Sequence, residues 1–484
     1  MKPHWLSSSV WNLLGTGLPF LVAVVCMPAL LHRLGAERYG LLILAWAVVG
    51  YFSIFDFGLS RAITQLVAQD YRESPAESGP VVATGITVLG VLGVLGGAVL
   101  FLCAPLISHV GKIPQLLQRE TIQSVRILGV GLPFVVVSTG LRGALEGVFD
   151  FARLNLIRVV AGVGTYLVPV VIASTSLRLD FICAGLVVLR AVICVAYFLR
   201  CRAFFGLRDV QYRLDGHLVK RLLTYGGWIT VSNLVSPLMA YLDRFLVAGT
   251  ISVSLAGYYS TSQEIVTKFQ IVPAAILAVL FPAISRRHTT SPVQAGEIFL
   301  RGTNFVTFTL LPVAVSCLLF AREGLSLWFG PTFGVEAYRV AQILTIGSFV
   351  NCLALNPFSF LQGIGRPDVT AKIHVIELPM YLLTLWALTA RFGIVGVALA
   401  WSSRMLFDLV LLLIATAKQS AAMREMLRTA VPRMTATIVL LASLVFVEAP
   451  AMKVAAVALV ALVSARMLWL EWSAGDIALL AAEQ

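Results

Sequence analysis

Five charged side chains lie deep inside long apolar runs of this 484-residue chain: Arg190, Glu264, Lys268, Arg404 and Asp408. A charge at the centre of a bilayer costs about 2.5–3.5 kcal/mol, so each such side chain either pairs with another charge or faces water. These residues therefore either form ion pairs or line an aqueous cavity within a membrane.

The spacing along the chain offers a partner to four of these five charges. Glu264 and Lys268 are four residues apart, as are Arg404 and Asp408, so each pair shares one helix face. Two interpretations stay open: the pairs only neutralise each other, or their helix faces line a central cavity. Arg190 has no obvious partner within its own helix and is the best single argument for a cavity.

Five further charges lie nearer the ends of apolar runs: Asp56, Asp243, Arg244, Arg301 and Glu377. Long side chains close to a helix end can extend their charge to the membrane interface, which is the simplest interpretation of such positions. Asp56, which Gly58 follows closely, either ends its helix or lines the cytoplasmic gate of a transport path.

The chain carries no motif of a catalytic or cofactor site. It has no DxD run, P-loop, HExxH or GxSxG sequence. Its six histidines are scattered and lie mostly at the ends of apolar runs, so we expect no metal site. We therefore expect neither an enzyme nor a bound cofactor.

The composition indicates an integral membrane protein. Hydrophobic residues make up 59% of the chain and charged residues only 12%, about half the share usual in soluble domains. A net charge of +12 would suggest nucleic acid as the partner of a soluble protein. Here the basic residues lie mainly between apolar runs, where they orient helices and meet anionic lipid headgroups, so we expect no nucleic acid.

The apolar runs predict an all-α membrane protein with about fourteen transmembrane helices. Strict alternation, the signature of a β-barrel, is absent. The predicted spans are residues 9–31, 39–58, 81–109, 121–143, 156–174, 180–199, 223–248, 255–282, 298–320, 338–362, 372–390, 393–417, 432–448 and 451–471. With alternating orientation, one side holds about twice as many Lys and Arg residues as the other, which predicts both termini in the cytoplasm.

The two halves of the chain resemble each other. Residues 127–160 align without gaps with residues 343–376, and a basic connector at 199–222 separates the halves. An offset of six spans keeps the orientation, so the sequence predicts a parallel repeat. We expect a six-helix bundle at 1–205, a cytoplasmic connector at 206–222, a second six-helix bundle at 223–420, and two additional helices with a cytoplasmic tail at 421–484.

Three stretches also resemble a known family: residues 34–68, 241–286 and 327–373. In this order and spacing they are similar to bacterial O-antigen-type oligosaccharide flippases, the polysaccharide biosynthesis transporters of the multidrug/oligosaccharidyl-lipid/polysaccharide exporter superfamily. The resemblance implies a V-shaped pair of six-helix bundles that moves a polyprenyl-pyrophosphate-linked oligosaccharide from the inner to the outer leaflet by alternating access. The last two spans depart from a twelve-helix plan.

The resemblance gives the charged residues candidate roles. Arg190, Lys268, Arg404 and Arg244 would bind the anionic substrate in the central cavity. The carboxylates would serve gating or ion coupling; these are Asp56, Asp243, Glu264, Asp408 and Glu377. It further implies a bacterial inner membrane, with membrane lipids and the polysaccharide polymerase machinery as partners.

Two other functions stay open at this point. A cation-coupled multidrug exporter of the same superfamily would use the same carboxylates. A membrane polysaccharide polymerase would need a long external loop, and the longest predicted one, at about residues 321–337, is short for that purpose.

Overall fold

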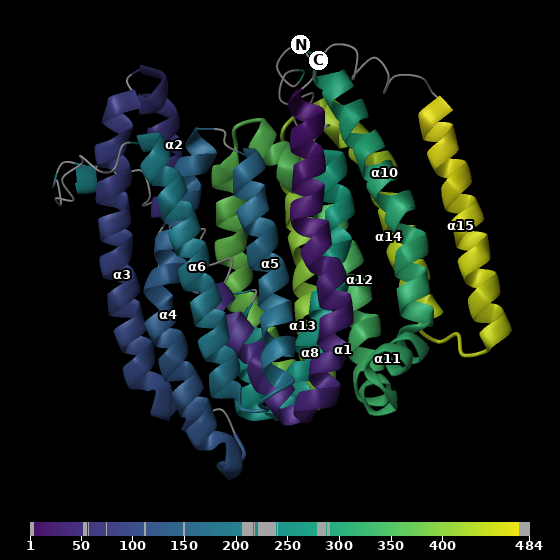
Figure 1. Cartoon of the computed structure of the whole chain (residues 1–484). Helices are drawn as coiled ribbons and strands as arrows, with labels where there is room; N and C mark the ends of the chain where they lie inside the picture. Colours follow the sequence, from purple (N-terminus) through teal and green to yellow (C-terminus); the bar gives the residue numbers. More distant parts are fainter. Residues whose placement is uncertain are drawn as a thin grey trace. The chain divides into compact units, whose positions relative to one another are not determined.

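In a computed structural model of the chain, every regular element of the described residues is a helix (Figure 1). The described residues are 4–51, 56, 58–73, 75–110, 113–148, 151–205, 216, 218–220, 239, 241–277, 287 and 291–473. The all-α class predicted from the sequence is confirmed. The helices are α1 (His4–Tyr51), α2 (Leu59–Glu73), α3 (Pro75–Val110), α4 (Gln115–Gly147), α5 (Phe151–Ala173), α6 (Leu179–Phe205), α8 (Val253–Thr267), the short 3-10 helix η2 (Lys268–Gln270), α10 (Pro292–Leu319), α11 (Ala321–Phe329), α12 (Pro331–Gly363), α13 (Pro367–Ala417), α14 (Ala421–Leu444) and α15 (Pro450–Ser473).

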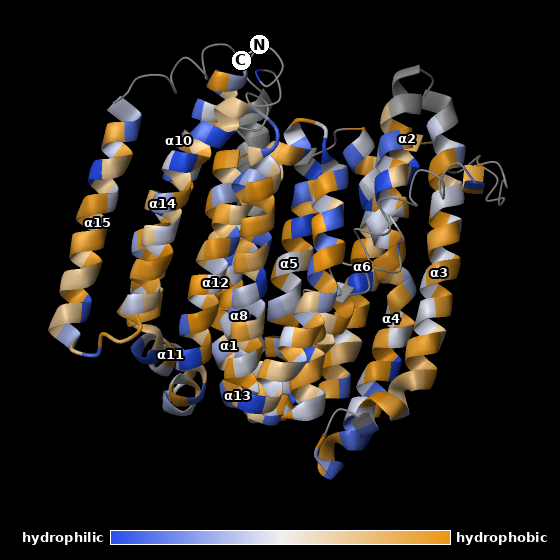
Figure 2. Ribbon diagram, turned by 180° about the vertical axis from the view of Figure 1, so that it is seen from behind, coloured by the Kyte–Doolittle hydropathy of each residue, from blue (hydrophilic) through white to orange (hydrophobic). Residues whose placement is uncertain are grey.

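Ten helices in the described part of the chain are long and apolar enough to cross a membrane. Figure 2 shows hydrophobic residues along most of their length. Large apolar side chains also remain exposed on their outer faces, for example Val25 (71%), Leu102 (75%) and Trp386 (72%). Such faces are stable against lipid and not against water, so the chain is a multi-pass membrane protein.

Two of these helices contain a break at a glycine. α1 has 48 residues and α13 has 51, which is more than twice the length of about 20 residues needed for one crossing. Gly35 (φ 74°, ψ 166°) and Gly393 (φ 57°, ψ −135°) interrupt them in conformations that a side chain would strain. Gly35 falls between the predicted spans 9–31 and 39–58, and Gly393 is the first residue of the predicted span 393–417. The total of fourteen stays a prediction, since spans 223–248 and 255–282 lie partly outside the described residues.

Helix α2 follows the second predicted span, where the sequence analysis placed only a connector. Leu59, Ile63 and Leu66 are fully buried on one face of α2, while Arg61 on another face is exposed. This spacing of three and four residues is that of an amphipathic helix. Hydropathy alone misses α2, because its polar face lowers the mean hydropathy of the segment.

The described helices divide into two compact units, residues 1–257 and 258–484. This places the described residues 241–257 with the first unit, whereas the sequence analysis assigned them to the second bundle. Much of the predicted connector 206–222 lies outside the described residues, so the predicted domain bounds and the V shape stay predictions.

Several helices of the two halves begin or end at residues that are 216 positions apart, the same offset as that of the sequence match. Both bounds of α12 equal those of α4 plus 216, and Ile343 follows Ile127 by the same number. The same offset relates the first residues of α5 and α13, and the last residues of α1 and α8. Chance matching of apolar residues does not reproduce helix ends, so the agreement supports a parallel duplication.

The last two helices belong to the second unit. Both α14 and α15 pack against α10. Two polar contacts fix α15 near its ends: Lys453 Nζ lies 2.6 Å from the Glu323 carboxylate of α11, and Asn304 of α10 donates to Glu471 at 2.6 Å. The helix therefore joins the unit through polar side chains as well as through apolar packing.

Helices α3 and α4 approach closely through glycines. A Cβ atom on Gly97 of α3 would collide with the backbone carbonyl of Gly129 on α4, and a Cβ on Gly93 would lie 2.7 Å from the Pro133 Cα atom. Small residues four apart let helix backbones pack tightly in membranes, where close packing replaces the hydrophobic effect.

We expect Gly97→Ala to destabilise the first unit by about 1–3 kcal/mol, because the added methyl group overpacks a backbone contact. Gly90→Ala on the same helix is the matched control, since its Cβ would lie 3.8 Å from Val137 in ordinary contact. Thermal unfolding of both purified variants in detergent measures the difference. Equal stability of the two variants would contradict this account of the α3–α4 contact.

Candidate functional site

A cluster of polar side chains lies between the two arms of α13. His374 and Glu377, three residues apart, share a face of the arm before Gly393, while Arg404 and Asp408, four apart, share a face of the arm after it. A Cβ on Gly396 would collide with the Leu388 carbonyl, so the arms meet directly at the bend. The folding back of α13 therefore brings these two faces together.

The cluster is buried and centred on Glu377, whose side chain is fully inaccessible. Arg404 Nε lies 3.5 Å from Glu377 Oε2. The Arg404 guanidinium also lies over the Tyr381 ring, 5.4 Å from its centroid. On the outer side of His374, its ring stacks on Phe358 of α12 at 6.1 Å between centroids.

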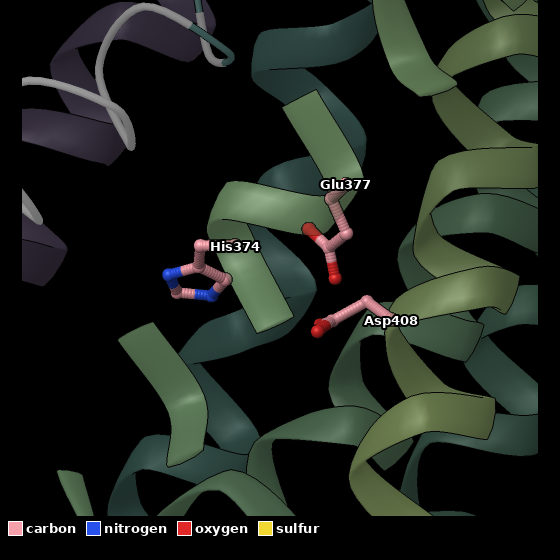
Figure 3. A group of neighbouring side chains, drawn as sticks. All are labelled: His374, Glu377 and Asp408. Carbon is pink, nitrogen blue, oxygen red and sulfur yellow. The ribbon is translucent and has the colours of Figure 1, made fainter. Parts of the chain in front are cut away.

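Three residues, His374, Glu377 and Asp408, each contribute one side-chain nitrogen or oxygen atom to a close group. These three atoms lie within 4.8 Å of one another. Figure 3 shows the carboxylates of Glu377 and Asp408 directed toward each other from the two arms. The sequence analysis treated His374 as one of several scattered histidines. The three-residue spacing of His374 and Glu377 could have indicated that they share a helix face. Only the bend at Gly393 adds Asp408 from the other arm.

Two of the interpretations that the sequence left open do not apply to this cluster. Arg404 pairs with Glu377 of the opposite arm and not with Asp408, four residues along its own helix. Glu377 does not extend to an interface, because it is fully buried. The physical reason is the same in both cases: α13 begins at Pro367, ten residues before Glu377, so this carboxylate lies well inside a helix that faces a second arm.

The charges of the cluster do not balance. Glu377 and Asp408 together carry two negative charges when ionised, and Arg404 supplies one positive charge. Asp408 is only 8% exposed, so water compensates little of the excess. Since an uncompensated buried charge is costly, the cluster favours uptake of one further positive charge, as a proton or a small cation.

The predicted Glu264–Lys268 ion pair is confirmed. Lys268 Nζ lies 2.5 Å from Glu264 Oε1, and both side chains are about one-third exposed. Nearby hydrogen bonds tie this segment to α12: Gln270 donates to Asn351 at 2.7 Å, and Ser348 donates to the Val266 carbonyl at 2.7 Å. The pair thus lies on a helix that the second unit holds firmly.

Arg190 on α6 finds its partner on another helix. One of its terminal nitrogens donates to Thr165 Oγ1 of α5 at 3.2 Å. A cavity of about 10 Å³, close to the smallest that holds a water molecule, lies beside it. The Arg190 Nε atom is buried and has no hydrogen-bond partner among the described residues. Among the described residues, Arg190 supplies the only polar side chain in the lining of that cavity, which is fewer polar groups than a buried water molecule usually contacts.

Asp56 caps the start of α2. Its Oδ1 atom accepts the Gly58 backbone N–H at 2.7 Å, and its Oδ2 atom accepts the Ser60 hydroxyl at 2.6 Å. Gly58 has a φ of 73°, which is the left-handed conformation that favours glycine. This geometry supports the interpretation of Asp56 as a helix-terminal residue, and a gating role stays a prediction.

Asp56→Asn separates the two interpretations. As a cap, asparagine performs nearly as well as aspartate, so we expect Asp56→Asn to keep stability and transport. Asp56→Ala removes both acceptors and should cost about 0.5–2 kcal/mol. Thermal unfolding and a transport assay of both variants provide the test. Loss of transport in a stable Asp56→Asn protein would instead support a role in gating.

Asp243 and Arg244 belong to the helical residues 241–250 of the first unit. Asp243 is fully buried, and its carboxylate accepts the Arg244 backbone N–H at 2.8 Å. Arg244 lies over the Tyr241 ring at 5.1 Å. Of the four predicted substrate-binding cations, Arg190 and Arg244 lie in the first unit, and Lys268 and Arg404 in the second. Their convergence on one cavity stays a prediction.

The chain is similar to known proteins along most of its length. Residues 30–337 match the family described as "Polysaccharide biosynthesis protein". The chain belongs to the polysaccharide biosynthesis protein family. It is 30% identical to a Shigella flexneri protein named "Putative O-antigen transporter", over 84% of this chain and 96% of the relative. A Haloferax volcanii protein named "Probable flippase AglR" is 24% identical over 76% of this chain and 74% of the relative.

Solved structures show the same fold for this polysaccharide biosynthesis family member. The inward closed lipid II flippase MurJ superposes with a TM-score of 0.71 at 11% identity, covering 96% of this chain and 99% of that one. An inward-facing multidrug resistance MATE transporter of the MOP superfamily gives 0.67 at 15% identity, covering 85% and 99%. The transporter fold predicted from the sequence is confirmed.

Proposed function

We propose that the protein is a flippase that moves a polyprenyl-pyrophosphate-linked oligosaccharide from the inner to the outer leaflet by alternating access, for O-antigen or exopolysaccharide assembly. The observation that carries the proposal is the 30% identity to the O-antigen transporter relative, over 84% of this chain and 96% of the relative. Family membership and the flippase name of the archaeal relative support the same substrate class.

The cations within spans suit such a substrate. Arg190 and Arg404 are held within their units by Thr165 and Glu377, and guanidinium groups can donate two parallel hydrogen bonds to a phosphate. Lys268 is about one-third exposed and accessible to a ligand. We propose that these side chains, with Arg244, bind the pyrophosphate and anionic sugars while the lipid tail stays in the bilayer.

The buried cluster of α13 suits ion coupling. Its excess negative charge favours one proton or small cation, and binding of that ion would weaken the hold of Glu377 on Arg404. We propose that uptake and release of this ion bias the second unit between its transport states, because a ligand shifts a conformational equilibrium only through different affinities for the two states. Glu264 and Asp243 are secondary candidates.

Two other functions have less support. A cation-coupled multidrug exporter shares the fold, but the MATE structure is only 15% identical, a likeness that concerns the fold alone. For a polysaccharide polymerase, the predicted external segment 321–337 contains only the short helix α11 and the start of α12. We therefore propose a transporter without catalytic activity, with both termini cytoplasmic in a bacterial inner membrane, working beside the polymerase machinery.

Deleting the chain in its native host tests the proposed function. We expect loss of surface polysaccharide and build-up of lipid-linked oligosaccharide on the cytoplasmic side, both restored by the wild-type chain. Lys268→Gln should fail to restore export, whereas Lys372→Gln, at a side chain that is 76% exposed, should restore it. Normal polysaccharide in the deletion strain, together with ethidium sensitivity, would favour the multidrug exporter.

A further inference from the structure

A second, larger cavity lies in the first unit; Phe245 in its wall directly follows Arg244, and Leu128 also borders the small cavity beside Arg190. It has a volume of about 360 Å³ and lies between the arm of α1 after Gly35, the end of α3, the first half of α4 and the helical residues 241–250. Ile113, just before α4, and Leu179, the first residue of α6, complete its wall. Its wall includes Ala45, Leu106, Leu128, Phe245 and Ala248. All of these residues lie within residues 1–257, so the cavity is a property of one compact unit.

The wall of this cavity offers no polar group that needs a partner. Its two hydroxyl residues, Thr121 and Ser124, donate to carbonyls of their own helix, to Leu117 at 2.8 Å and to Glu120 at 2.8 Å. The remaining lining side chains are aliphatic or aromatic, apart from one glycine. Since a water molecule needs two to four polar partners in a cavity, this one suits hydrocarbon and not water.

Charged side chains next to the apolar wall of the cavity pair with one another. Glu120, next to Thr121 in the chain, receives two hydrogen bonds from Arg38 and one from the backbone N–H of Leu179, which itself lines the cavity. The neighbouring Arg178 pairs with Asp180 at 2.6 Å. These charges satisfy one another, so they leave the hydrocarbon character of the cavity unchanged.

The end of α3 gives access to the membrane. Leu106 is 63% exposed and Ile107 is 38% exposed, although both also line the cavity. Ala45, Leu128 and Ala248 on the opposite wall are buried. In a membrane protein, an exposed apolar rim beside a buried apolar wall lets a chain enter from the bilayer.

The volume indicates the kind of chain. A cavity of about 150 Å³ lined by aliphatic residues holds one benzene ring, so 360 Å³ corresponds to about 14 carbon atoms. We propose that this cavity binds one acyl chain of a membrane phospholipid, entering past Leu106. A polyprenyl tail is far longer, and only a small part of it would fit. The bound chain would fasten α4 to α1 and to residues 241–250, whatever substrate the protein moves.

Photolabelling in vesicles of phosphatidylethanolamine and phosphatidylglycerol tests the proposal with the full chain. One set of vesicles carries phosphatidylethanolamine with a diazirine at the end of an acyl chain, and a second set carries a photoreactive polyprenyl phosphate. After illumination, peptide mapping should find acyl-chain adducts on the buried wall residues Leu128 and Ala248. Ala45→Phe fills the cavity and should abolish these adducts.

Val25→Phe is the matched control on the same helix, because Val25 is 71% exposed and lies outside the cavity wall. It should keep the adducts, and thermal unfolding should show that both variants are folded. Adducts confined to the exposed rim at Leu106, or unchanged in a folded Ala45→Phe protein, would overturn the proposal. Adducts from the polyprenyl probe alone would overturn the assignment to a phospholipid acyl chain.

Discussion

Replacing Arg404 with methionine should destabilise the second unit by about 3–5 kcal/mol, because a buried carboxylate is left without its counter-charge. Glu377 is fully inaccessible and Arg404 only 12% exposed, so solvent cannot take over the role of the lost guanidinium. Asp408, which faces Glu377, increases the negative charge left behind. We expect a strong loss of protein from the membrane, measured by immunoblot of membrane fractions and by thermal unfolding.

The double variant Arg404→Met with Glu377→Gln separates stability from transport. Removing both charges of a buried pair is often nearly neutral for stability, so we expect membrane abundance to recover. Transport should remain absent: Asp408 keeps one excess negative charge, but the Glu377–Arg404 pair that ion binding is proposed to loosen is gone. A double variant that transports normally would show that the cluster only holds the two arms of α13 together. Unchanged abundance of the single variant would contradict the ion pair.

Replacing Glu120 with alanine should cost the first unit about 3 kcal/mol, since three hydrogen bonds converge on this carboxylate. Arg38 donates to both of its oxygens at 3.2 Å, and the Leu179 backbone N–H donates to one of them. The Glu120 side chain is only 11% exposed, so its loss leaves a backbone donor and a guanidinium poorly satisfied. The contact joins three helices: α1 after its break, the start of α4 and the start of α6.

Glu146→Ala on the same helix is the control for Glu120→Ala. Glu146 pairs with Arg142 at 3.4 Å, but the two side chains are 38% and 44% exposed. An exposed pair of this kind contributes about 0.2–1 kcal/mol, so we expect a small effect. Thermal unfolding of both variants in detergent gives the comparison. Similar losses in the two proteins would show that the Glu120 contact does not hold the three helices.

The polar cluster is present in only one copy of the repeat. With the offset of 216 residues, the equivalents of His374, Glu377, Arg404 and Asp408 are Arg158, Ala161, Val188 and Val192. One feature does recur: Thr165, the partner of Arg190, is the equivalent of Tyr381, which contacts Arg404. Both halves thus carry an arginine held against the same helix position, and only the second half adds the excess carboxylate.

The sequence by itself determined the features that depend on neighbours along the chain. Long apolar runs specify spanning helices because the bilayer leaves no other partner for the backbone. They also divided residues 9–58 and 372–417 into two spans each, although the breaks at Gly35 and Gly393 became visible only in the structure. Spacing by four residues correctly gave the Glu264–Lys268 pair, since helix geometry alone brings those side chains together. The offset of the repeat was also readable, because it relates one stretch of residues to another.

Only the tertiary structure decided which distant groups meet. Glu120 and Arg38 are 82 residues apart, and Arg190 and Thr165 are 25 apart, so no helix spacing relates them. Arg404 had a partner available at four residues, yet the bend of α13 presented Glu377 from the other arm. The outcome depends on how two helices align along each other, which is set by packing at residues such as Gly396 and not by local propensity.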